Sequence, residues 1–81
     1  MNEATLLRFE RVMAERGRGR TATYDDVKKG LLTAPVPLGG RRIGWPAGEI
    51  SRLNAARIAG KSDDEIRELV RQLHEARKAL A

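Results

Sequence analysis

Hydrophobic positions recur with a helical period in several separate parts of the chain. The first part places Phe9, Val12 and Met13 on one face, which predicts a short helix that ends near Gly17. The last part predicts a helix over residues 63 to about 80, with an apolar stripe along one face. That stripe consists of Ile66, Leu69, Val70, Leu73, Ala76 and Leu80.

Polar residues indicate a second helix after the first. Thr21 or Thr23 can act as its N-cap, and Gly30 can close it. The aspartates at 25–26 would then lie in the first turn and the lysines at 28–29 in the last, an order that suits the helix dipole. Capping explains these adjacent aspartates better than catalysis, because neighbouring helical side chains do not converge on one atom.

The stretch PVPLGGRRIGW, residues 35–45, predicts a β-hairpin with Gly39 and Gly40 as a two-residue loop, since both glycines tolerate positive φ. Counting outward from that loop gives the cross-strand pairs Leu38–Arg41, Pro37–Arg42, Val36–Ile43 and Ala34–Trp45. Alternation then places four apolar side chains on one face: Val36, Leu38, Ile43 and Trp45. The prolines of the first strand cannot donate ladder hydrogen bonds, so that strand should be an edge.

Pro46 fits the first position of a third helix that runs through residues 49–59 and ends at Gly60. Its candidate buried positions are Ile50, Leu53 and Ile58. Ser62 and Glu65 have the spacing of a capping box before the last helix.

The predicted fold is therefore mainly α with one small β-hairpin. We expect one domain over residues 1–60 and a C-terminal amphipathic helix over residues 61–81. The apolar stripe of that helix either packs on the chain's own core or approximates the a/d spacing that pairs with a second copy or a partner helix. The second alternative would make the chain a protein-interaction module or a homodimer.

The charge of the chain favours a polyanionic partner. The 81 residues carry 16 lysines and arginines against 11 aspartates and glutamates, a net charge of +5. Most of the excess lies in residues 1–45, which hold 9 basic and 5 acidic groups. A small basic domain of this kind suggests nucleic acid, although charge alone does not distinguish DNA from RNA, and solubility is the simpler explanation.

Other function classes find little support. There are no cysteines, no apolar run of the roughly 18 residues that a membrane span needs, and no signal-peptide pattern, so we expect a cytoplasmic protein. The one histidine, His74, fits a solvated helix position. PLGGRRIG lacks the lysine and the following helix of a phosphate loop. We therefore expect no enzyme, no cofactor and no metal site.

DNA binding has more support from the residues. A helix that follows a glycine-bearing turn can enter the major groove, and a basic hairpin can contact the backbone or the minor groove, which is a winged helix-turn-helix. The candidate DNA-binding residues are Arg18, Arg20, Thr21, Tyr24, Lys28, Arg41 and Arg42. Tyr24 could instead be a half-buried core residue, and Trp45 is expected in the core. We expect the hairpin tip and the cationic segment before Thr21 to share one outward surface.

Three segments, LLRFERVMAERG, RGRTATYDDVKKGLLTAPVPLGGRRIGW and PAGEI, resemble the AlpA-like regulators of prophages. Those proteins belong with the MerR-like and excisionase-like winged helix-turn-helix domains, and the resemblance covers about residues 5–51. It implies sequence-specific binding of double-stranded DNA by a transcription regulator of mobile-element genes or a recombination directionality factor. It also implies that Arg20, Thr21 and Tyr24 match the recognition helix, and that Arg41 or Arg42 is the wing arginine.

The chain departs from the family pattern around Tyr24. The family commonly has leucine before this tyrosine, where the chain has Thr23. A basic residue and then an apolar residue often follow, where the chain has Asp25 and Asp26. Carboxylates that faced a groove would repel phosphate, which leaves three hypotheses: a helix shifted in register, a different partner or a degraded site.

Overall fold

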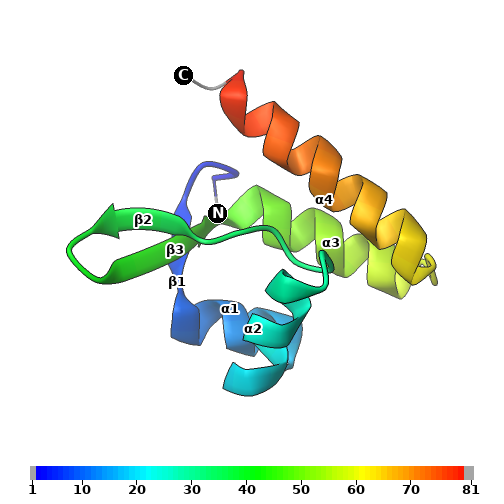
Figure 1. Cartoon of the computed structure of the whole chain (residues 1–81), viewed down its shortest axis with the longest axis horizontal. Coiled ribbons are helices and arrows are strands. Elements are labelled where there is room, and N and C mark those ends of the chain that lie inside the picture. The colour runs from blue at the N-terminus through cyan, green and yellow to red at the C-terminus, as the bar shows by residue number, and fades with distance from the viewer. Residues whose placement is uncertain (1, 80–81) are drawn as a thin grey trace.

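The computed structural model describes residues 2–79, which form four helices and one three-stranded sheet (Figure 1). In chain order the elements are β1 (Leu6–Arg8), α1 (Phe9–Arg16), α2 (Arg20–Lys28), β2 (Val36–Gly39), β3 (Arg42–Pro46), α3 (Ala47–Ile58) and α4 (Asp63–Lys78). Helix α3 contacts α1 and α4 (Figure 1). The arrangement agrees with the predicted winged helix-turn-helix and additional C-terminal helix.

The antiparallel sheet has the strand order β1-β3-β2, so the predicted hairpin gains a third strand. Strand β1 pairs Leu7 with Trp45 and Arg8 with Gly44. The sequence pattern does not indicate β1, because three residues are too few for a period-two pattern to stand out beside the following helix. Strand β2, which contains Pro37, lies at an edge as expected.

The predicted hairpin register is wrong. The structure pairs Val36 with Gly44 and Gly39 with Arg42, and an irregularity between Pro37 and Gly39 absorbs one residue. Gly39 and Gly40 do adopt positive φ angles, 103° and 58°. A Cβ built on Gly44 would lie 3.0 Å from Leu38 Cδ1, so the Leu38 side chain covers Gly44.

Because side chains alternate along a strand, this contact puts Leu38 on the face opposite Trp45 and Ile43. Val36 lies on that same face, because it pairs with Gly44. The expected single apolar face is therefore wrong for both Val36 and Leu38, since a slip of one residue in the register turns each side chain of a strand to the other face of the sheet.

Helix α2 begins two to four residues earlier than the sequence predicts. Its N-cap is Gly19, and Thr21 and Thr23 both lie inside the helix, so neither threonine is the cap. No acidic residue occupies the first turn, and the expected match of the aspartates to the helix dipole is wrong. Thr23 is fully buried within the helix, so its side chain faces the core and not the free backbone N–H groups at the helix start.

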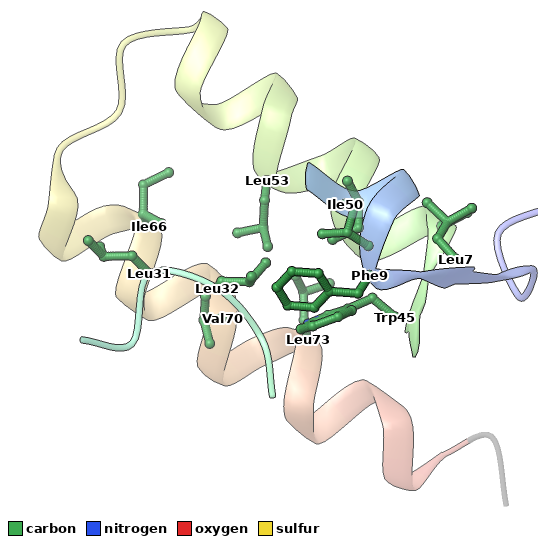
Figure 2. Close-up of a cluster of buried hydrophobic side chains, with 12 residues drawn as sticks. Leu7, Phe9, Leu31, Leu32, Trp45, Ile50, Leu53, Ile66, Val70 and Leu73 are labelled. Atoms are coloured by element: carbon green, nitrogen blue, oxygen red, sulfur yellow. The ribbon is translucent and has the colours of Figure 1, made fainter. Parts of the chain in front are cut away.

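Trp45 lies at the centre of the core, as expected. Its side chain is fully buried, and its indole Nε1–H donates a hydrogen bond to the Thr33 carbonyl at 2.7 Å. Figure 2 shows the Phe9 ring beside the Trp45 ring, and the two centroids are 5.8 Å apart. The aromatic pair thus joins α1, which begins at Phe9, to strand β3, which contains Trp45.

Helix α3 has Pro46 as its N-cap rather than its first residue. Ile50 and Leu53 are buried as predicted, but Ile58 is 87% exposed. The helical period explains this error, because Ile58 points about 140° away from Leu53 around the helix axis.

Helix α4 begins with the predicted capping box between Ser62 and Glu65. Ile66, Val70 and Leu73 are buried and turn toward the segment after α2 (Figure 2), whereas Ala76 is exposed and Leu80 lies outside the described residues. The predicted stripe therefore covers the chain's own core in this structure. Homodimerisation through α4 and the boundary at residue 60 stay predictions.

Candidate nucleic-acid interface

One face of α2 carries four exposed side chains: Arg20, Thr21, Tyr24 and Lys28. Their spacing places them within an arc of about 100° around the helix axis. Thr23 and Asp26 lie on the other side and are buried. The predicted recognition-helix residues are thus brought together on one solvent-facing stripe.

Phe9 supports two members of this stripe. The ring centroids of Phe9 and Tyr24 are 4.9 Å apart. The guanidinium carbon of Arg20 lies 4.8 Å from the Phe9 centroid. Tyr24 remains 46% exposed, so the core alternative accounts for only part of its ring. Stacking on a buried ring restrains both side chains without neutralising the arginine charge. The sequence pattern places Phe9 on the apolar face of the first helix and does not indicate this supporting role.

Asp26 does not face solvent. It is 4% exposed, and its carboxylate lies 2.8 Å from Arg16 Nη2 and 2.9 Å from Arg18 Nε. Thr23 and Asp26 therefore occupy inward positions of α2, where the family pattern has apolar residues. Burial of these two side chains agrees with an unshifted helix.

Asp25 is the one aspartate of α2 that reaches the surface, where Lys29 Nζ lies 2.8 Å from its carboxylate. The hydrogen bond from Lys29 lowers the pKa of Asp25, and the same bond raises the pKa of Lys29. The pair is mutually neutralised, so it adds no net charge beside the stripe.

The wing is the hairpin formed by β2 and β3, residues 36–46. It carries Arg41 in its loop and Arg42 at the start of β3, and both are exposed. A third arginine, Arg8 of β1, pairs with Gly44. Since Arg42 and Gly44 are two residues apart on β3, Arg8 and Arg42 lie on the same face of the sheet. The sequence pattern does not indicate Arg8 as a binding residue, because it does not indicate β1.

Ion pairing distinguishes the lysines and arginines of this surface from those of the rest of the protein. Five of the 16 lysines and arginines have no carboxylate partner among residues 2–79. They are Arg8, Arg20, Lys28, Arg41 and Arg42. All cations of α3 and α4 are paired within the described part of the chain. Among the lysines and arginines of this described range, the uncompensated positive charge therefore lies in β1, α2 and the wing.

Two other predicted positions behave differently. Arg18 shares Asp26 with Arg16 and keeps a 47% exposed side chain, so its DNA contact stays a prediction. His74 was expected to be solvated, but it is only partly exposed and its Nε2 accepts a hydrogen bond from the Ala34 N–H at 3.0 Å. Helical periodicity could not indicate this bond, because Ala34 lies in an irregular segment 40 residues earlier.

Within residues 2–79, no group of three or more histidine, cysteine, aspartate or glutamate side chains is placed to hold a metal ion. None of the helices in this range is long and apolar enough to cross a membrane.

Two comparisons found known proteins that are similar to this chain in sequence. An uncharacterized protein, ORF88, of Enterobacteria phage P4 is 33% identical over 61 residues, which are 75% of this chain and 69% of that protein. No solved structure matches the chain. Residues 5–58 match the model of the family described as prophage CP4-57 regulatory protein (AlpA). Since this match spans β1 to α3 and more than half of the sequence, the chain belongs to the AlpA family of prophage regulatory proteins.

Proposed function

We propose that the chain binds double-stranded DNA sequence-specifically and regulates transcription of prophage or mobile-element genes. The observation that carries the proposal concerns residues 2–79, in which the five cations without a carboxylate partner all lie in β1, α2 and the wing. Cations that lack an internal partner are free to replace the counterions of a phosphate backbone. Such a regulator would act in the cytoplasm, as expected from the sequence.

Helix α2 and the wing would make different kinds of contact with DNA. Helix α2 would enter the major groove with the planar Arg20 fork at a guanine or a phosphate. The hydroxyls of Thr21 and Tyr24 can bond phosphate oxygens or base edges, and Lys28 would meet the backbone. The wing arginines would contact the backbone or the minor groove beside it.

The start of α2 adds donors to this surface. Gly19 provides no side-chain cap, and the first turn holds no acidic residue. The first backbone N–H groups of the helix are therefore available to a phosphate, with the positive end of the helix dipole behind them.

Fluorescence anisotropy on the promoter region of the host element, over a series of salt concentrations, tests the proposal. With four or five phosphates contacted, log affinity should fall with log salt at a slope of about −4. Changing both Arg41 and Arg42 to alanine should reduce that slope by about 1.8, because each lost phosphate contact removes about 0.9.

Arg71→Ala is the matched control. Arg71 is an exposed arginine of α4 that already pairs with Glu68, so its removal should leave affinity and slope unchanged. Binding without salt dependence, or equal affinity for the wing variant and the wild type, would overturn the proposal. Tighter binding to the attachment site of the element than to its promoter would instead favour a recombination directionality factor.

A further inference from the structure

The segment that joins α2 to the wing, residues 29–35, has no helix or strand of its own. It connects α2 to β2, the first strand of the wing. We call it the linker. Two of its hydrophobic residues, Leu31 and Leu32, are buried, and the Thr33 carbonyl accepts the Trp45 indole hydrogen bond. The middle of the linker is therefore anchored in the core.

Helix α4 holds both ends of the linker by its backbone. Near the start, Arg67 Nε donates a hydrogen bond to the Lys29 carbonyl at 2.8 Å. Near the end, the Ala34 N–H donates to His74 Nε2 at 3.0 Å, and Arg77 Nη2 donates to the Ala34 carbonyl at 2.7 Å. Both polar groups of the Ala34 peptide backbone are thus bound by α4 side chains.

Arg77 is itself fixed by a second element. Its Nε and Nη2 atoms each lie 2.7 Å from an oxygen of Glu49 on α3, a bidentate pair in which the glutamate side chain is 8% exposed. One guanidinium therefore joins α3, α4 and the end of the linker. A planar group with several donors is suited to this role, whereas a lysine ammonium could not reproduce the same fork.

We propose that α4 is a clamp on the linker that sets the position of the wing relative to α2, with His74 and Arg77 as its positioning residues for DNA binding. The DNA part of this inference rests on the proposed function. The region matched by the family model ends at residue 58, so the clamp lies outside it. A wing held in place before binding does not have to be ordered on the DNA, which saves conformational entropy and increases affinity.

The test uses a double variant, His74→Leu with Arg77→Lys. It removes the His74 acceptor and the arginine fork that joins the Ala34 carbonyl to Glu49, but keeps a cation opposite Glu49. The matched control is Arg71→Met, which changes an α4 arginine that pairs with Glu68 and does not hold the linker. A conservative variant, His74→Gln, retains a hydrogen-bond acceptor and should behave like the wild type.

The first measurement needs no DNA. The chain has no cysteine, so nitroxide labels at Thr21→Cys and Arg41→Cys report the distance between α2 and the wing tip by pulsed electron resonance. We expect a narrow distance distribution in the wild-type background and in both controls, and a broad one with the double variant. Amide exchange at Ala34 should become faster in the double variant alone. A distribution that stays narrow would overturn the clamp, whether or not the protein binds DNA.

The second measurement is affinity for the promoter fragment. The double variant should bind about five- to tenfold more weakly at one salt concentration, because one or two further groups must be ordered on binding. Its salt slope should stay unchanged, because no phosphate contact is removed. A broader distribution with unchanged affinity would overturn the positioning role, while absence of DNA binding by the wild type would overturn the proposed function instead. If the double variant fails to fold by circular dichroism, the single variants His74→Leu and Arg77→Lys decide the same outcomes.

Discussion

Arg16 of α1 and Asp26 of α2 form an ion pair of 2.8 Å in which both side chains are more than nine-tenths buried. Arg18, in the turn between the two helices, reaches the same carboxylate. The pair fixes α1 against α2 at the point where the chain reverses direction. It also places the exposed stripe of α2 outward, because the opposite side of the helix is committed to Arg16.

Asp26→Asn should destabilise the fold strongly. The substitution keeps the shape of the side chain but leaves the buried Arg16 guanidinium without its counter-charge, which costs about 3–5 kcal/mol in the free energy of unfolding. Urea unfolding followed by circular dichroism measures the loss. Asp25→Asn is the control, since that neighbouring carboxylate is exposed and should leave the unfolding midpoint nearly unchanged. Equal effects of the two substitutions would contradict a special role for the buried pair.

Thr23→Val should stabilise the protein. Thr23 is fully buried, and its hydroxyl oxygen has no hydrogen-bond partner among the described residues. Valine has nearly the same shape and a similar helix propensity, so removing the unsatisfied hydroxyl should raise the free energy of unfolding by about 1 kcal/mol. Thermal unfolding gives the comparison. A lower melting temperature would show that the hydroxyl is satisfied in solution.

Trp45→Phe should weaken the junction between the linker and the sheet. Phenylalanine retains an aromatic ring but cannot donate to the Thr33 carbonyl, and a buried carbonyl left without its partner costs about 1–3 kcal/mol. The smaller ring adds a cavity penalty in the same direction. Chemical unfolding monitored by far-ultraviolet circular dichroism measures the sum. Stability equal to that of the wild type would contradict the structural importance of this bond.

Arg8→Ala tests a DNA contact that the sequence did not indicate. Because Arg8 has no carboxylate partner among residues 2–79, its removal should lower DNA affinity and reduce the salt slope by about 0.9. Arg52→Ala is the comparison, because Arg52 is an exposed arginine of α3 that already pairs with Glu3. Similar slopes for these two variants would remove Arg8 from the interface.

Glu65 should give α4 a contribution that depends on pH. Hydrogen bonds from the Ser62 backbone N–H and then its side chain lower the pKa of Glu65 below its usual 4.5. Because the pKa of Glu65 is lower in the folded state than in the unfolded state, its ionised carboxylate stabilises the fold at pH values above the unfolded pKa. This contribution is lost as the pH falls through the folded pKa. The stability difference between wild type and Glu65→Gln should therefore be constant near neutral pH and shrink below about pH 4.5. A stability difference between the two proteins that does not change with pH would contradict this role of Glu65.

The helices could be predicted because their signals are local. The capping box at Ser62 and the period of Ile66, Val70 and Leu73 require only nearby residues, and the structure confirms both. The fold class and the AlpA family followed from the hairpin segment and the residues around it, and the family comparison confirms them. The burial of Trp45 followed from the same apolar pattern.

The sequence-based predictions fail where contacts between residues far apart in the chain determine the structure. Strand β1 exists because Leu7 finds Trp45 in β3, and no three-residue pattern can indicate that pairing. The hairpin register depends on one irregularity in β2 that the glycine pair alone does not specify. Asp26 looks like a surface carboxylate until Arg16 is brought against it. The partner of His74 likewise becomes apparent only when α4 docks on the linker.

The internal ion pairs of α3 and α4 affect how the protein turns as it diffuses toward a charged partner, before the two make contact. Because that half of the molecule neutralises its own charges, a distant polyanion attracts one side of the protein more strongly than the other. The resulting torque would turn α2 and the wing toward a duplex during diffusion, so that a larger fraction of encounters begins in a productive orientation.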